Sequence, residues 1–522
     1  MKNLFFFLLL CLFATNLLAQ PNIEWEKSLG GTNNETTFKI INTLDGGFLV
    51  GSLTESNNGD VSGNHGSADI WLTKIDNNGI IQWQNCLGGL DFEVVVGMDN
   101  TNDGGYILVG NTFSNGGKNT SQVYGNHGGQ DIWAVKVDQF GNMEWRHCYG
   151  GCAQDDARAI QQTSDGNYVI VGGTLSVNSG DVYGVHGDWD AWALKIGRDG
   201  ALIWQNVIGG SGIDYFYTLE ETNTGTLIVG GLTSSFDGDL NGSDNKGEED
   251  VWVAQLSADG DLLWNQTYGG SSYDGARGMC LSTEGDILIA GVTYSSDGDV
   301  TGWHGGNDAW VLRLDADGNL LWENAFGGSS NETAYSVFQR TDNDFIFAGE
   351  ATSFDGDVTG NHGGVEAWVV KFDKNGLLKT SICLGGSSAD LSRSATQGID
   401  NSVIVGGTSA STDGDVSFNH GLSDAWIVKL SVPLGLKPEA PNNEALAMEL
   451  SPNPASNLVK ILTNVVGLKK LEIFDESGKL IQALEMDQPE KSLHINTLPA
   501  GIYRVKMTTQ TGQVLSAQFV KA

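Results

Sequence analysis

The sequence has few prolines, few cysteines and few basic residues for its length. Eight prolines stand beside 72 glycines in 522 residues, a balance that favours many tight turns over a helix-rich fold. Six cysteines, one of them within the first 20 residues, leave an odd number for the rest of the chain. At least one of these is unpaired, or all are reduced. Only 28 Lys and Arg face 64 Asp and Glu, so the surface is expected to repel nucleic acid.

Long apolar runs are confined to the N-terminus. The stretch MKNLFFFLLLCLFATNLLAQ has a basic start, an apolar core and small residues at its end, which predicts a secretory signal peptide over residues 1–19. No later segment approaches the roughly 20 apolar residues that a membrane helix needs. We therefore expect an exported chain with no transmembrane segment of its own.

The negative charge is unevenly distributed. Residues 20–441 hold 56 acidic and 19 basic residues, whereas the stretch from Asn442 onward holds 8 of each. Such a strongly acidic body could attract cations or basic partners. Acidity is also an ordinary route to solubility outside the cell. The shift in charge separates a long acidic region from a neutral tail.

A repeat of about 59 residues dominates the acidic region. A tryptophan that precedes a glycine pair by five residues recurs at steps of 58 to 62 residues, and Thr380 holds the seventh place. These tryptophans are Trp25, Trp83, Trp145, Trp204, Trp264 and Trp322. A second series is complete in all seven units: Trp71, Trp133, Trp192, Trp252, Trp310, Trp368 and Trp426. The chain is therefore built from seven copies of one structural unit.

Each unit reads as four short antiparallel strands, here called A to D. In the fifth unit they are expected at residues 276–282, 286–293, 308–315 and 319–325, where aromatic and β-branched residues alternate with polar ones. Clusters of Gly, Asp and Asn separate the strands as turns do. Repeated four-stranded meanders of this length are typical of propeller blades.

The order of the strands predicts a closed ring. A D strand comes first, at Trp25, and the last unit ends on its C strand at Trp426 without a D strand of its own. The N-terminal strand can complete the last blade, which removes an open sheet edge. We expect an all-β, seven-bladed β-propeller over residues 20–430. The units resemble bacterial secreted β-propeller repeat proteins of the Bacteroidetes type, a resemblance that implies a fold and an outer location but no reaction.

The C-terminal tail has a different pattern. Residues 431–443 contain three prolines and read as a linker. Residues 444–522 contain LSPNP, LEIFD, LPAGIY and a terminal FVKA in that order, and they suggest a small β-sandwich of about seven short strands. These motifs closely resemble the Por C-terminal sorting domain of the type IX secretion system. The resemblance implies recognition by that machinery and secretion across the outer membrane, to an extracellular or surface-attached location.

One acidic residue recurs in every D–A loop, four residues after the second glycine of the pair. The seven are Glu35, Glu93, Asp155, Asp214, Asp274, Glu332 and Asp390. The A strand is the innermost strand of a blade, so these residues, the ring acids, are expected to circle the mouth of the central channel. Like charges so arranged raise one another's pKa. They need relief from backbone donors, side-chain donors, separation in water or a cation.

The B–C loops carry a second pattern of Asp-Gly-Asp, a histidine, and an acid two residues before the C-strand tryptophan. Three interpretations stay open: a hydrogen-bonded brace of acid, histidine and tryptophan, a calcium site, and a transition-metal site. The brace histidines are His65, His127, His186, His304, His362 and His420. The candidate metal ligands are Asp297, Asp299, Asp308, Asp355, Asp357, Asp413 and Asp415. No cofactor is certain, and calcium is the candidate ion.

Signatures of catalysis are few. The chain has no GxSxG, no HExxH and no P-loop, and catalysis needs one asymmetric group of residues. The aromatic residues that break the repeat pattern are candidates for ligand binding: Trp303, Trp189, Tyr215 and Tyr217. We expect a binding or adhesion module for a glycan or protein ligand on the face of the B–C and D–A loops. The alternatives are a polysaccharide-acting enzyme, a glycoside hydrolase or lyase, and a purely structural surface scaffold.

Overall fold

The computed structural model describes residues 22–116, 121–242, 244–431, 448–451, 458–463, 469–475, 479–486, 490–509 and 514–521. The chain divides into two compact units, residues 1–433 and 434–522. The predicted signal peptide lies outside the described residues, as does all of the predicted linker except Ser431. The described residues contain no helix long and apolar enough to cross a membrane.

The first unit consists of seven antiparallel sheets of four strands each. The strands of the first three blades, in order A to D, are β2 (Glu35–Asn42), β3 (Phe48–Thr54), β4 (Asp69–Ile75) and β5 (Ile81–Leu87); β6 (Glu93–Asn100), β7 (Tyr106–Thr112), β8 (Asp131–Val137) and β9 (Met143–Tyr149); β10 (Asp155–Gln162), β11 (Tyr168–Thr174), β12 (Asp190–Ile196) and β13 (Leu202–Ile208). Those of the next three are β14 (Asp214–Glu221), β15 (Leu227–Thr233), β16 (Asp250–Leu256) and β17 (Leu262–Tyr268); β18 (Asp274–Leu281), β19 (Ile287–Thr293), β20 (Asp308–Leu314) and β21 (Leu320–Phe326); β22 (Glu332–Gln339), β23 (Phe345–Ala351), β24 (Glu366–Phe372) and β25 (Leu378–Leu384). A short 3-10 helix, η1 (Gly238–Leu240), lies in the B–C loop of blade 4.

The seventh blade joins the two ends of the propeller. It contains β26 (Asp390–Gln397), β27 (Val403–Ser409) and β28 (Asp424–Ser431), and its D strand is the N-terminal β1 (Asn22–Leu29). Strand β1 pairs antiparallel with β28, so that Ser28 lies opposite Trp426 and Leu29 opposite Ala425. Neighbouring A strands contact one another all the way round, from β2 through β6, β10, β14, β18 and β22 to β26 and back to β2. The predicted seven-bladed propeller, closed by its N-terminal strand, is confirmed.

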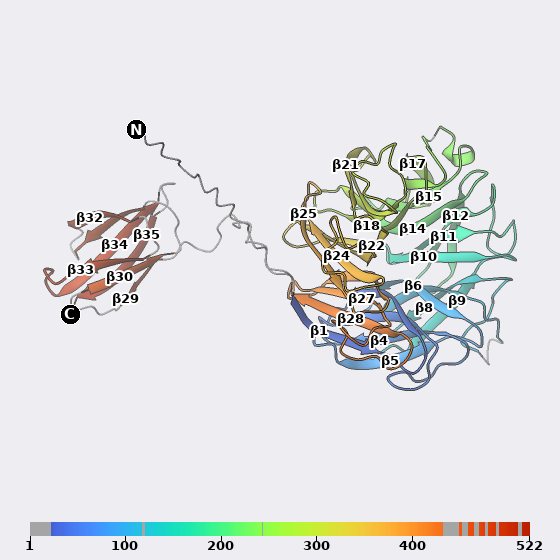
Figure 1. Ribbon diagram of the computed structural model, residues 1–522, viewed down its shortest axis with the longest axis horizontal. Helices are drawn as coiled ribbons and strands as arrows, with labels where there is room; N and C mark the ends of the chain where they lie inside the picture. Colours follow the sequence, from blue (N-terminus) through green and yellow to red (C-terminus); the bar gives the residue numbers. More distant parts are fainter. Residues whose placement is uncertain are drawn as a thin grey trace, which may run out of the picture. The chain divides into compact units, whose positions relative to one another are not determined.

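The apolar core lies between the blades. Strands B and C are buried almost throughout, because each sheet is covered on both faces by its neighbours. The seven C-strand tryptophans are among the largest fully buried side chains. One cluster joins Trp71 of blade 1 with Ile427 of blade 7. Figure 1 shows the A strands β6, β10, β14, β18 and β22 gathered at the centre of this unit.

The second unit is a small β-sandwich, as predicted. One sheet has the order β29 (Met448–Ser451), β30 (Leu458–Thr463), β33 (Glu490–His494), and the other β32 (Leu480–Met486), β31 (Lys469–Phe474), β34 (Gly501–Thr509), β35 (Val514–Lys521). Ile461 of the first sheet and Ile473 and Val505 of the second share one buried cluster. Burial of this shared face holds the two sheets together.

The closure can be tested at the last residue of β1. Leu29 and Leu87 end the D strands of blades 7 and 1, and both are buried. If β1 is a full member of the last blade, Leu29→Ala and Leu87→Ala should each lower the free energy of unfolding by about 2–5 kcal/mol, because each leaves a cavity. Urea denaturation of the two variants measures this. A loss for Leu87→Ala alone would contradict the closure.

Candidate functional site

The ring acids are buried by the loops that connect the blades. Each is the first residue of an A strand and has no exposed surface. Glu35 accepts hydrogen bonds from the Gly31 N–H at 2.8 Å and from the Thr54 hydroxyl at 2.7 Å. Backbone and side-chain donors therefore stabilise these carboxyls. They begin the strands that surround the channel, but they do not face open solvent.

A second acid lies beside each ring acid across the junction between two blades. At the first junction a Cβ atom added to Gly88 would lie 2.5 Å from Asp69 Oδ1 and 2.8 Å from Glu93 Oε2. Asp69 begins the C strand of blade 1 and Glu93 the A strand of blade 2, and both are fully buried. The first glycine of the pair is thus the residue that leaves room for the two carboxyls.

These acid pairs have perturbed pKa values. Burial, together with the nearby Asp155 carboxyl, raises the pKa of Asp131 to about 6 against hydrogen bonds from His127. Burial likewise raises the pKa of Asp250 to about 6, with Asp274 as the nearby acid. A buried carboxyl beside another gains from holding a proton.

The histidines of the B–C loops bind the C-strand acids. The distance from Nδ1 to the carboxylate is 2.8 Å for His304 and Asp308, and four other blades have the same contact, at His65, His127, His362 and His420. His186 departs from this pattern: its Nδ1 lies 3.9 Å from Asp190 Oδ1, and its backbone N–H makes the hydrogen bond. In blade 5 the tryptophan lies outside this contact, since Trp310 Nε1 donates to Glu323 on the D strand.

The Asp-Gly-Asp loops bind the neighbouring D–A loop. Asp299 accepts from the Gly269 N–H at 3.1 Å, and Asp297 accepts from the Ser271 N–H at 2.8 Å. The same two contacts recur for Asp355 and Asp357, and for Asp413 and Asp415. Asp308 belongs to the separate histidine contact. Within the part of the chain that the structure describes, no three His, Cys, Asp or Glu side chains form a group that could hold a metal ion. The proposed calcium ligands are thus divided between two groups.

A different set of residues lines the channel. Every A strand has an irregular register three residues after its ring acid, where one extra residue bulges out of the pairing. β-Bulges redirect side chains and often lie next to functional sites. The seven bulge residues all line one cavity of about 760 Å³ and are called the bulge ring here: Phe38, Val96, Arg158, Tyr217, Arg277, Tyr335 and Arg393.

The bulge ring is asymmetric in a fold of repeated units. Blades 1 and 2 contribute apolar residues, and blades 3 to 7 alternate arginine with tyrosine. The guanidinium of Arg158 lies 5.2 Å and that of Arg277 4.4 Å from the centre of the Tyr217 ring. Arg393 lies 4.2 Å from the centre of the Tyr335 ring. Cation–π contacts therefore hold the arginines against the tyrosine faces.

The three arginines differ in their partners. Arg158 forms an ion pair with Asp156 at 2.7 Å. Arg277 donates a hydrogen bond to the Tyr273 hydroxyl at 2.7 Å. Neither Arg277 nor Arg393 has an ion pair with any residue in the described ranges. Counting only partners that the structure describes, the guanidinium groups of Arg277 and Arg393 thus line the cavity without a carboxylate.

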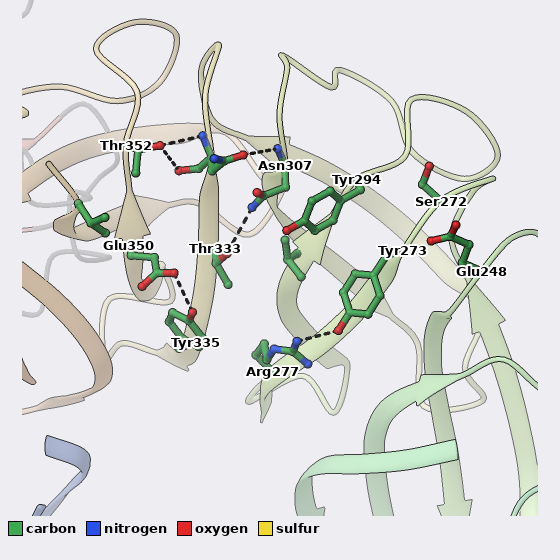
Figure 2. Close-up of a pocket in the computed structure, with 13 residues that line it drawn as sticks. Glu248, Ser272, Tyr273, Arg277, Tyr294, Asn307, Thr333, Tyr335, Glu350 and Thr352 are labelled. Carbon is green, nitrogen blue, oxygen red and sulfur yellow. Dashed lines mark hydrogen bonds between the residues drawn. The ribbon is translucent and has the colours of Figure 1, made fainter. Parts of the chain in front are cut away.

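A pocket of about 720 Å³ opens between blades 5 and 6 and shares Arg277 and Tyr335 with the channel. Figure 2 shows Arg277 and Tyr335 at one end of the pocket, with Tyr294, Asn307 and Thr352 toward the loops. Tyr294 and Asn307 belong to the B–C loop of blade 5, so the pocket lies on the face where a ligand was expected. The Tyr335 hydroxyl donates to Glu350 at 2.8 Å, and burial raises the pKa of Tyr335 to about 12.

Three of the four aromatic residues singled out in the sequence lie together. The Tyr215 ring centre is 5.5 Å from that of Trp189 and 4.9 Å from that of Tyr217. Tyr215 is buried, and its hydroxyl donates to Asp156, the partner of Arg158. Tyr217 belongs to the bulge ring and lines the channel. Behind it, Tyr215 packs against Tyr217 and Trp189 packs against Tyr215. Trp303 is 40% exposed and lines neither cavity, and its Nε1 donates to the Gly306 carbonyl.

Sequence reasoning missed Arg158, Arg277, Tyr335 and Arg393. The signal for them is present in the sequence, because each follows its ring acid by three residues. Aligning the seven units at that position would have revealed an alternation of arginine and tyrosine. Because the residue at this position differs between units, a comparison of the repeated motifs does not single it out.

Comparison with known proteins identifies the second unit. Residues 449–521 match the family of secretion system C-terminal sorting domains. The C-terminal unit is a type IX sorting domain. The protein is therefore delivered by type IX secretion to the cell surface or the extracellular space, and it interacts with that machinery. No curated protein matched the chain.

Solved structures similar to the chain are distant. The WD40 domain of Neurospora crassa Pan2 is 10% identical, with 78% of this chain and 95% of that chain covered and a TM-score of 0.43. A protein of unknown function from Dyadobacter fermentans is 9% identical, with 79% and 99% covered and a TM-score of 0.42. A fungal alcohol oxidase of the AA5 family, solved with copper, is 12% identical, with 96% and 99% covered and a TM-score of 0.42. The seven blades are established by the sheet order of the chain itself.

The acid pairs predict an unusual pH dependence of stability. Folded pKa values of about 6 for Asp131 and Asp250 lie above the unfolded value of about 3.9, so the folded protein binds more protons between these values. Their contribution to stability is fully present below about pH 4 and is lost as the pH rises through about 6. The melting temperature should therefore rise as the pH falls from 8 to 5, and Asp131→Asn should reduce this slope. A melting temperature that falls over this range would contradict the prediction.

The contribution of the histidine brace can be tested by comparing His304, whose imidazole contacts its C-strand acid, with His186, whose imidazole does not. His304→Ala removes the imidazole from the buried Asp308 and should lower the free energy of unfolding by about 1–3 kcal/mol. His186→Ala should cost clearly less, because its imidazole makes no close contact with Asp190. Chemical denaturation of both variants measures the difference. Equal losses would show that the imidazole contact contributes nothing.

Proposed function

We propose that this protein is a secreted or surface-attached ligand-binding module whose ligand, a glycan, occupies the bulge ring and the adjoining pocket between blades 5 and 6. The asymmetry of the bulge ring carries the proposal. Positions that serve the fold, such as the ring acids and C-strand tryptophans, recur in all seven units. The bulge residues differ from blade to blade and line a cavity, as expected of residues selected for a ligand.

The pocket has the chemistry that a sugar needs. Tyr273 and Tyr294 contact each other edge to face, with ring centres 5.8 Å apart, and both line the pocket. Aromatic rings offer flat apolar surface with a polar edge, which suits the C–H face of a sugar ring. Asn307, Thr333 and Glu350 supply amide, hydroxyl and carboxylate groups for sugar hydroxyls.

One observation favours a polysaccharide-acting enzyme as the second candidate. Glu220 lines the channel, and burial raises its pKa to about 7, against a hydrogen bond from Gln161 and the charge of Lys39. Burial also raises the pKa of Asp99, another channel residue. A carboxyl that titrates near neutral pH suits general acid catalysis, and glycoside hydrolases use two carboxyls.

A glycan array probed with the purified protein tests the binding proposal, and two exposed aromatics provide matched variants. Tyr294 lines the pocket and is 49% exposed, whereas Trp303 is 40% exposed and lies outside both cavities. Tyr294→Ala should weaken binding of an array-positive glycan by about fivefold or more, equivalent to about 1 kcal/mol, and Trp303→Ala should leave it unchanged.

The same assay separates the alternatives. Breakdown of a bound glycan that Glu220→Gln abolishes would establish the enzyme. Binding that Trp303→Ala weakens and Tyr294→Ala leaves intact would move the site to the loop of Trp303. Absence of binding to every glycan would leave a structural scaffold.

A further inference from the structure

The bulge ring has the opposite charge to the protein that contains it. The chain has a formal net charge of −36, yet the seven bulge positions hold three arginines and no acid. Chance placement of 28 basic residues among 522 would rarely give three arginines at seven equivalent positions. A positive centre within an acidic propeller therefore calls for its own explanation.

Buried arginines elsewhere in the same blades are neutralised. Arg313 on β20 lies 2.8 Å from Glu284 and 2.5 Å from Asp286, and Arg340 lies 3.3 Å from Asp342. These two arginines, which are buried, are thus both paired with carboxylates. Arg277 and Arg393 are only partly buried, and within the described residues neither has a carboxylate partner, so their guanidinium groups remain available to an anion.

The two unpaired arginines lie on either side of one tyrosine. Tyr335 is the bulge residue of blade 6, between Arg277 of blade 5 and Arg393 of blade 7. Both cations influence the pKa of Tyr335, Arg393 more strongly than Arg277. Arg277 lines both the pocket and the channel, and Arg393 lines the channel. Arg277 is therefore reached from both cavities, and Arg393 from the channel.

We propose that the ligand is an acidic saccharide, and that Arg277 and Arg393 bind its carboxylate or sulfate group. This inference rests on the proposed function, since it names the class of glycan that the same site takes. Guanidinium groups bind carboxylates and sulfates through paired N–H donors. The stacking of both arginines on tyrosine faces holds them in place before the ligand arrives, which lowers the entropy cost of binding. The sugar ring then lies in the pocket against Tyr273 and Tyr294.

Titration calorimetry with matched saccharides tests the inference. The probes are an oligogalacturonate and its methyl ester, which differ in the carboxylate charge, and a sulfated galactan oligosaccharide and its desulfated form. We expect at least one acidic form to bind about tenfold or more tightly than its neutral counterpart. The pair that shows the difference tells whether the site takes a carboxylate or a sulfate.

Variants assign that preference to the arginines. Arg277→Gln and Arg393→Gln should each reduce the preference for the acidic form while leaving binding of the neutral form in place, a result that misfolding would not produce. Lys379→Gln is the charge-matched control, because Lys379 lies on the outer strand β25 and pairs with Asp344. It should leave the preference unchanged, and each variant should keep the melting temperature of the parent protein.

The outcomes distinguish the inference of an acidic saccharide from the underlying proposal that the protein binds a glycan. Equal binding of acidic and neutral forms, unaffected by either arginine variant, would overturn the acidic class and leave a neutral glycan-binding module. A preference that Lys379→Gln also removes would overturn the role of the two arginines. Binding of none of the four saccharides, together with a negative glycan array, would overturn both proposals.

Discussion

The buried ring acid is the interaction on which the rest of the propeller depends. Its carboxylate accepts hydrogen bonds from the glycine-pair loop and from the end of the B strand, as Glu35 does from Gly31 and Thr54. It therefore fixes the point at which each A strand begins. The bulge follows three residues later in every blade, so the same contact sets the height at which seven side chains enter the channel.

In this chain, the positions that repeat in every blade serve the structure, and the positions that differ between blades are the candidates for function. Residues that hold blades together are repeated because each junction presents the same neighbours. The buried acids between neighbouring blades illustrate this. Asp69 and Glu93 lie beside each other at one blade junction, as Asp131 and Asp155 do at the next. All seven blades meet at the channel, so a ligand bound there, as we propose, would contact each blade differently. The differences among the bulge residues are what such a ligand would require.

The structure divides the candidate metal ligands of the B–C loop between two sets of contacts. Asp297, Asp299 and Asp308 are close in sequence, and a loop that closed on itself would have gathered them around an ion. The Asp-Gly-Asp turn instead packs on the glycine pair that precedes its own blade, and Asp308 turns to His304. The partners of the two Asp-Gly-Asp carboxylates are thus backbone N–H groups of the D–A loop.

The sequence by itself determined the seven blades, the closing N-terminal strand, the sorting domain and the face on which loops gather. These features follow from local patterns: strand alternation, turn residues and the 59-residue period. It also pointed to Tyr217 as part of an aromatic cluster. Only the tertiary structure decided that Tyr217 belongs to a ring with Arg277, Tyr335 and Arg393, and that Trp303 lies outside it. The ring exists only when seven segments spread over more than 350 residues converge on one axis, and their convergence depends on blade packing rather than on any pattern within one repeat.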